Sequence, residues 1–122
     1  MKLIKVVIKP EKLPDVRKEL VKKNIVGMTV YDVHGCGLQK GYTEEYRGVV
    51  HDVNLLRKVV IDIVVDDNEV DKIVKAIIKG AKTGNIGDGK IFVSNIEEAI
   101  KIRTGEKGKK AINNKEKKWK QY

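Results

Sequence analysis

Lys58-Val-Val-Ile-Asp-Ile-Val-Val-Asp-Asp-Asn-Glu-Val-Asp-Lys-Ile-Val-Lys-Ala-Ile-Ile-Lys-Gly-Ala81 decides the fold, because its hydrophobic period changes part-way along. In the first part apolar residues occupy every second position, which is typical of a half-buried strand. In the second part they recur at helical spacing, which predicts an amphipathic helix over residues 70–81. The strand positions are Val59, Ile61, Ile63 and Val65, and the helix positions are Val70, Ile73, Val74, Ile77, Ile78 and Ala81. Asp66, Asp67 and Asn68 lie between them and are candidates for the helix N-cap.

Similar patterns lie on both sides of this stretch. Residues 3–9 alternate between apolar and charged side chains and predict a strand, and residues 11–23 carry apolar side chains at helical spacing. Further strands are expected over residues 28–33, 90–94 and 99–103. Up to residue 94 the order is β-α-β-β-α-β, which is the ferredoxin-like arrangement. We therefore expect an α+β fold, with a four-stranded antiparallel sheet and both helices packed on one face.

The second face of such a sheet has no helix to cover it. Ile4, Val6, Val60 and Val64 are candidates for this face. An oligomer interface would remove these apolar side chains from water.

A polar stretch from Gly35 to Asn54 separates two of the predicted strands. It contains four glycines, several charges and no strong periodicity. A compact domain rarely keeps so long a loop without secondary structure unless the loop has a function. Loops also carry much of the binding chemistry of proteins. We expect this loop to contact a partner or a ligand.

Length and charge limit the possible classes of protein. The chain has 122 residues, which fits one domain, and a net charge of +9. Seven lysines and two glutamates over residues 104–122 contribute +5 of that charge. A basic chain can bind nucleic acid, but the few aromatic residues form no stacking platform with basic ones, and a solvated lysine-rich tail is the simpler explanation.

Cysteine usage and hydropathy indicate the compartment. Cys36 is the only cysteine, so no intrachain disulfide can form, and a cytoplasmic location fits. The stretch from Met1 to Lys9 carries charges within its apolar run and lacks a signal-peptide cleavage site. No apolar segment reaches the roughly 20 residues that a membrane-spanning helix needs.

Thr83-Gly-Asn-Ile-Gly-Asp-Gly-Lys90 places three glycines and a lysine in eight residues. Glycines let backbone N–H groups approach an anion closely, and a lysine adds positive charge. The stretch lacks the Gly-Lys-[Ser/Thr] ending of a Walker A loop. Its spacing alone leaves two explanations open, a phosphate site and a plain turn between a helix and a strand.

Several motifs in the chain resemble, in the same order, those of one family. They are Ile8-Lys-Pro-Glu-Lys-Leu13, Gly27-Met-Thr-Val30, Gly35-Cys-Gly-Leu-Gln-Lys-Gly41, Thr43-Glu-Glu-Tyr-Arg-Gly48, Thr83-Gly-Asn-Ile-Gly-Asp-Gly-Lys-Ile-Phe-Val93 and Arg103-Thr-Gly-Glu106. The family is that of the PII nitrogen-regulatory proteins, and the subgroup most resembled is the GlnK type, of archaeal origin. The resemblance runs from Met1 to about Ile112. It implies a PII-like domain over residues 1–112, with the T-loop of the family at about 36–55 and a basic tail at 113–122.

The resemblance implies a non-enzymatic sensor. PII proteins are homotrimers of ferredoxin-like subunits, which would cover the open sheet face. They bind ATP or ADP in clefts between subunits, and they sense 2-oxoglutarate together with Mg-ATP. The T-loop of GlnK-type members docks on an ammonium transporter. A cytoplasmic protein that is recruited to the membrane by that channel is therefore expected.

The resemblance also assigns site residues. Nucleotide contacts are expected from Thr29, Leu38, Val64, Gly87, Asp88, Gly89, Lys90, Lys101 and Arg103. Contacts with 2-oxoglutarate are expected from Gly37, Gln39, Lys40, Gly41, Lys58 and Gly87. Gln39 is also expected to bind Mg. Partner contacts are expected from Tyr46, Arg47 and Gly48, with Arg47 entering the channel mouth.

The chain departs from the family pattern at several positions. Leu38 stands where many members have a phosphate-contacting arginine, so discrimination between ATP and ADP is open. Lys101 replaces another arginine, and the bidentate geometry of a guanidinium is lost. His51 stands where bacterial members carry the tyrosine that is uridylylated, so that modification is not possible at this position. Cys36 is explained more simply as a small residue at the loop root than as a redox group.

Three alternatives to a channel regulator stay open. In the first, the T-loop acts on a soluble enzyme of nitrogen metabolism, such as nitrogenase or glutamine synthetase. A basic nucleic-acid-binding module is a more distant alternative, and no nucleic-acid partner is expected. An enzyme has the least support, because no paired carboxylates, nucleophile–base pair or metal cluster can be placed in one cleft.

Overall fold

The computed structural model describes residues 1–25, 27–35 and 55–112 and the backbone of residues 42–46 and 49–53. Single-turn 3-10 helices at Pro10–Lys12 and Asp67–Glu69 precede the first two α-helices. The strands and α-helices follow in the order β1 (Lys2–Ile8), α1 (Leu13–Lys22), β2 (Thr29–Gly35), β3 (Tyr42–Tyr46), β4 (Val49–Val53), β5 (Leu56–Val65), α2 (Val70–Ala81), β6 (Lys90–Asn95) and α3 (Lys109–Ile112).

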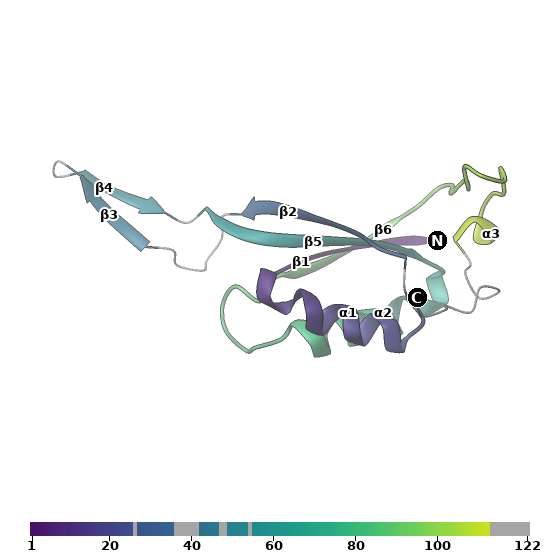
Figure 1. Ribbon diagram of the computed structural model, residues 1–122, viewed down its shortest axis with the longest axis horizontal. Coiled ribbons are helices and arrows are strands. Elements are labelled where there is room, and N and C mark those ends of the chain that lie inside the picture. The colour runs from purple at the N-terminus through teal and green to yellow at the C-terminus, as the bar shows by residue number, and fades with distance from the viewer. Residues whose placement is uncertain (26, 36–41, 47–48, 54, 113–122) are drawn as a thin grey trace.

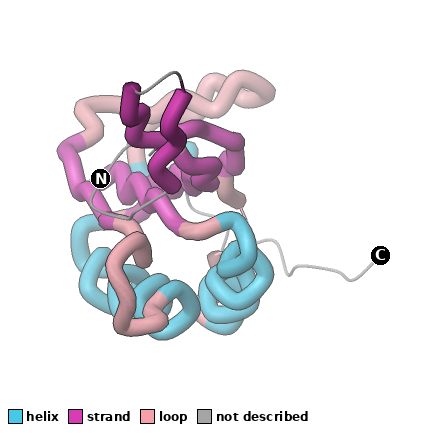
Figure 2. The backbone as a smooth tube through the Cα atoms, turned by 90° about the vertical axis from the view of Figure 1, so that its left-hand side faces the viewer, coloured by secondary structure: helices cyan, strands magenta, loops and turns pink. Residues whose placement is uncertain are grey.

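Four of the strands form one antiparallel sheet in the order β2-β5-β1-β6. β1 and β5 are central, because each pairs on both sides, and β2 and β6 form the edges. α1 and α2 lie side by side against one face of the sheet, as Figures 1 and 2 show from two directions. The expected α+β, ferredoxin-like βαββαβ fold is therefore confirmed.

The hydrophobic core fills the space between this face and the helices. Gly80 of α2 lies directly on α1, since a Cβ atom at this position would be 2.8 Å from the Cα of Val16. The two helices can approach so closely only because Gly80 has no side chain. The buried residues of the core are Ile4, Val6, Ile8, Val16, Leu20, Val59, Ile61, Ile63, Val65, Ile73, Ile77 and Ala81.

One expectation about the faces of the sheet is half wrong. Ile4 and Val6 are fully buried under the helices and do not belong to the open face. The helices cover this set because Ile4, Val6 and Ile8 form an uninterrupted apolar row with Lys2 only at its start, whereas Lys5 interrupts the opposite set in the middle of the strand. Val60 and Val64, which are paired with Val7 and Leu3, lie on the open face as expected.

The helices begin differently from the expectation. The predicted N-cap residues at 66–68 do not cap α2, because the 3-10 turn intervenes and Glu69 takes the N-cap position. Asp67 instead forms an ion pair of 2.9 Å with the N-terminal ammonium of Met1. In the part of the chain that the structure describes, no helix is both long and apolar enough to cross a bilayer.

The strand expected over residues 99–103 is wrong. The segment forms only an isolated bridge between Ile100 and Lys107, and a turn in which the Gly105 N–H donates to the Lys101 carbonyl. Ile102 is fully exposed. Alternating side chains do not make a strand here, because no described strand of the chain lies beside the segment to pair with it.

The long polar stretch contains more structure than expected. β3 and β4 pair as an antiparallel hairpin, with Tyr46 opposite Val49. Figure 1 shows this hairpin extending beyond the end of the main sheet. Tyrosine occurs twice in β3 and valine three times in β4, and the preference of both residues for extended backbone explains the hairpin. β2 and β5 approach it together, because Gly35 and Leu56 are still paired.

Candidate functional site

The glycine-rich loop between α2 and β6 lies at the end of the sheet where β5 begins. Lys90 pairs with Val7, and Val59 pairs with Ile8, so the start of β6 and the start of β5 meet at the same end of β1. A hydrogen bond of 2.9 Å from Lys58 Nζ to the Gly87 carbonyl joins β5 to the loop. The fold thus brings the predicted effector lysine next to the predicted phosphate loop.

The conformation of the loop depends on glycine. Gly84, Gly87 and Gly89 have φ angles of +89°, +101° and +109°, which L-residues with side chains rarely adopt. Gly89 also crosses β1 so closely that a Cβ atom would lie 1.7 Å from the Val7 carbonyl oxygen. Backbone N–H groups in such turns form concave sites that attract anions.

Asp88 bonds to its own loop. Its Oδ2 accepts hydrogen bonds of 2.8 Å from the N–H groups of both Thr83 and Gly84. Its Oδ1 accepts a hydrogen bond from the Thr83 hydroxyl and lies 3.3 Å from Lys9 Nζ. The Thr83 hydroxyl and then the backbone donors hold the pKa of the Asp88 carboxyl well below its usual range. The carboxylate is therefore ionised and already bound by several donors.

The surroundings of Lys58 disfavour the charged form of its side chain. Partial burial lowers the pKa of its ammonium, and the positive charge of Lys9 lowers it further. The Gly87 carbonyl is one of its acceptors. An anion placed here would relieve the repulsion between the two lysines.

Four of the predicted nucleotide residues lie away from the loop. Val64 pairs with Leu3 and Thr29 pairs with Asp62, toward the opposite end of β5 from Lys58. Lys101 and Arg103 follow the end of β6, and Lys101 Nζ lies 3.7 Å from Glu106 Oε1. Given the rise per residue of an extended strand, Lys58 and Val64 of β5 are about 20 Å apart. Within one chain the predicted nucleotide site is thus split between the two ends of the sheet.

Comparison with known proteins identifies the family. The family model described as nitrogen regulatory protein P-II matches residues 1–106. This chain belongs to the nitrogen regulatory protein P-II family. A P-II protein of Nostoc punctiforme is 54% identical over 112 residues, which cover 92% of this chain and 100% of the relative. P-II 2 of Methanothermobacter thermautotrophicus is 52% identical over 92% of this chain and 97% of its own length, and P-II of Haemophilus influenzae is 54% identical over 92% and 100%.

Several of the predicted P-II residues cannot be placed. Tyr46 belongs to β3, but its side chain lies outside the described part of the structure. The other residues outside it are Gly37, Leu38, Gln39, Lys40, Gly41, Arg47, Gly48 and the tail 113–122. The predicted Mg contact and the predicted partner contacts therefore stay predictions. Among the described residues, no group of three or more His, Cys, Asp or Glu side chains could hold a metal ion.

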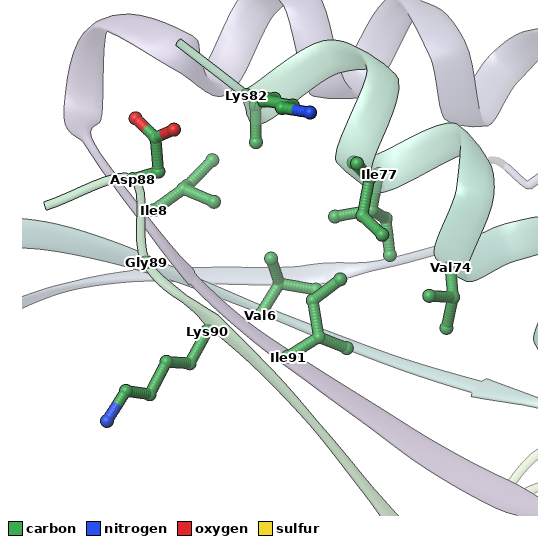
Figure 3. A pocket seen from close by; sticks show the side chains of 11 residues that line it. Val6, Ile8, Val74, Ile77, Lys82, Asp88, Gly89, Lys90 and Ile91 are labelled. Carbon is green, nitrogen blue, oxygen red and sulfur yellow. The ribbon is translucent and has the colours of Figure 1, made fainter. Parts of the chain in front are cut away.

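A groove beside loop 83–89 has a different character. It has a volume of about 370 Å³ and lies between α2 and the strands β1 and β6. Figure 3 shows Val6, Val74, Ile77 and Ile91 around this space, whereas the ammonium of Lys90 points away from it. Because the walls are mostly apolar, this groove does not suit a phosphate.

Two residues of the P-II site were not predicted from the sequence. Lys9 follows β1 as a single charge, and only the register of the sheet brings it to Asp88. Thr83 opens the glycine-rich stretch, but its role as a donor to Asp88 depends on the turn of the loop. The spacing of Thr83 and Asp88 within a glycine-rich segment was the one available signal.

Proposed function

We propose that this P-II chain is a nitrogen-status sensor that binds ATP or ADP and, together with Mg-ATP, 2-oxoglutarate. The observation that supports this best is the arrangement at the start of β5. There a loop with positive-φ glycines lies against Lys58, close to where the chain enters the sheet from the T-loop. The Lys58 ammonium, together with N–H groups of the loop other than those that bind Asp88, would favour a polyanion at this place. Lys58 would pair with a carboxylate of 2-oxoglutarate, and Gln39 would contact Mg.

The split of the nucleotide residues supports a homotrimer. Gly87, Gly89 and Lys90 lie at one end of the sheet, and Lys101 with its neighbours lies at the other. A single nucleotide could touch both groups only if they came from two chains. We propose that adjacent subunits supply them, and that this assembly covers the open face of the sheet.

We further propose a regulator of the GlnK type without enzymatic activity. Bound ligands would select T-loop conformations by their different affinities for each. The loop in one conformation, with Tyr46, Arg47 and Gly48, would bind an ammonium transporter and recruit the protein to the membrane from the cytoplasm. The names of the relatives, which are nitrogen regulatory proteins, agree with a regulatory role.

Isothermal titration calorimetry tests the sensor function. We expect ATP and ADP to compete for one class of site, and 2-oxoglutarate to bind detectably only when Mg-ATP is present. Lys58→Met should abolish binding of 2-oxoglutarate, because the carboxylate loses its counter-charge. Lys72→Met, at an exposed position of α2, is the matched control and should bind as the unaltered protein does. Equal affinity for 2-oxoglutarate with and without nucleotide would contradict the proposal.

A further inference from the structure

Among the described residues, four donors contact the Asp88 carboxylate, and they come from the loop itself and from the end of β1. The donors are the N–H groups of Thr83 and Gly84, the Thr83 hydroxyl and the Lys9 ammonium. The side chain is 23% exposed. A carboxylate with this set of donors has little remaining capacity to contact a ligand, and it would repel a phosphate at close range.

These contacts close the loop at one end, and Gly89 fixes it at the other. The bonds from Thr83 and Gly84 to Asp88 tie the start of the loop to its end. Immediately afterwards Gly89 lies against the Val7 carbonyl, which leaves no room for a shift toward β1. Gly87 lies between the two fixed points, with its carbonyl turned to Lys58. The carboxylate therefore determines how the loop lies relative to Lys58.

Lys9 contributes to the same arrangement. Its Nζ lies 3.3 Å from Asp88 Oδ1 and 3.4 Å from Thr83 Oγ1, and its side chain is only 14% exposed. The Thr83 hydroxyl in turn accepts a hydrogen bond of 3.2 Å from the Asn85 N–H. Lys9 and Thr83 thus link the end of β1 to both the first and the last part of the loop.

We propose that Asp88 is a positioning residue, whose carboxylate holds loop 83–89 in its binding conformation through Thr83, Gly84 and Lys9 and does not itself contact the nucleotide. This inference rests on the proposed binding of nucleotides at the loop. It replaces the direct phosphate contact that the family resemblance assigned to Asp88. Because the donors to Asp88 belong to the protein itself, the inference can be tested on the protein alone.

Amide hydrogen exchange of the ligand-free protein tests the positioning role. In Asp88→Ala, the Thr83 and Gly84 amides lose their acceptor, and we expect them to exchange at least about tenfold faster, with the amides of β1 and β5 unchanged. Asp71→Ala, an exposed position on α2, is the control and should leave the loop amides unchanged. Unchanged exchange at Thr83 and Gly84 in Asp88→Ala would overturn the proposal.

Nucleotide titrations test the link to binding. Asp88→Ala should weaken Mg-ADP binding by roughly 10- to 100-fold, which is the usual effect of losing hydrogen bonds to a charged group. Thr83→Val keeps the shape but removes the hydroxyl and should weaken binding about tenfold, whereas Thr83→Ser should stay within about twofold. In the Asp88→Ala background, Thr83→Val should cause no further loss, because both changes remove the same contact.

The outcomes separate this inference from the proposed function. If the unaltered protein bound neither ADP nor ATP, the proposed function would fail while the exchange experiment still decided the role of the carboxylate. If Asp88→Ala weakened binding but left loop exchange unchanged, Asp88 would be a direct ligand contact. If Asp88→Ala unfolded the chain, the comparison of Thr83→Val with Thr83→Ser would decide, and equal losses in both would contradict the inference.

Discussion

At the scale of single residues, Gly89 is the most constrained position of the loop. It combines a φ of +109° with a backbone approach that would place a Cβ atom 1.7 Å from the Val7 carbonyl oxygen. Gly84 has a similar φ of +89°, but no atom lies within 4 Å of the place a Cβ atom would take. Substitutions at these two glycines therefore distinguish the effect of backbone strain alone from that of strain combined with a steric clash.

Gly89→Ala should destabilise the protein much more than Gly84→Ala. The methyl group at Gly89 must force β6 away from β1, and we expect a loss on the order of 3 kcal/mol in the free energy of unfolding. Gly84→Ala adds only the strain of a left-handed residue, about 1 kcal/mol. Urea denaturation at matched protein concentration measures both. If the two variants lost similar amounts of unfolding free energy, β6 would be able to move away from β1 at no energetic cost.

The sequence predicted the site residues that depend on local motifs better than those that depend on register. The glycine-rich loop could be recognised because glycine and lysine are close together in the chain. Lys9 could not, because a lone lysine after a strand is usually solvated, and its contact with Asp88 requires the pairing of β1 with β6. The split of Lys101 and Arg103 from the loop likewise follows from the direction of β6 and from no local pattern.

At the scale of elements, the period of β5 and α2 predicted the fold, while the assignment of faces needed the structure. Both faces of β5 carry valine or isoleucine, so alternation alone does not show which face the helices cover. β1 resolves this, because Ile4, Val6 and Ile8 are buried under the helices and Lys5 faces the other way. Residues 99–103 show a different limit of sequence patterns. Their side chains alternate, but they form no strand because no described strand lies beside them to pair with.

The hairpin of β3 and β4 is the element on which partner binding should depend. We expect Arg47→Ala to weaken co-sedimentation with membranes that contain the ammonium transporter at least about tenfold, because a charged contact in the channel mouth is lost. Nucleotide affinity should not change, since loop 83–89 is joined to β5 at Lys58 and not to the hairpin. Loss of both membrane binding and nucleotide binding in Arg47→Ala would argue against a role confined to the loop tip. If the P-II chain instead stayed in the soluble fraction, bound to an enzyme of nitrogen metabolism, the alternative target would be favoured.

At the scale of the whole molecule, the arrangement of charges supports the proposed site between chains. Lys58 and loop 83–89 lie at one end of the sheet, and the segment with Lys101 and Arg103 follows the strand end at the other. Exposed apolar side chains on the sheet and on that segment, among them Phe92 and Ile102, would be covered in an assembly.

Mixing two defective subunits tests the shared site. Lys58→Met and Arg103→Ala should each lose Mg-ATP-dependent binding of 2-oxoglutarate when they form homotrimers. Mixed trimers, made by unfolding and refolding the two variants together, should regain binding at those interfaces where an intact Lys58 meets an intact Arg103. Calorimetry on the mixture measures the recovered sites. No recovery in trimers shown to be mixed would place both residues in a site within one chain.

The pairing of Gly35 with Leu56, with the hairpin lying beyond it, has a mechanical consequence. Both strands that lead to the hairpin end their pairing in the main sheet at Gly35 and Leu56, so the hairpin would rotate about this pair. Lys58 is two residues from Leu56, while Tyr46 and Val49 pair at the far end of the hairpin. A small rotation at Leu56 would therefore become a much larger displacement at the tip, and a ligand the size of a single dicarboxylate could move a surface far larger than itself.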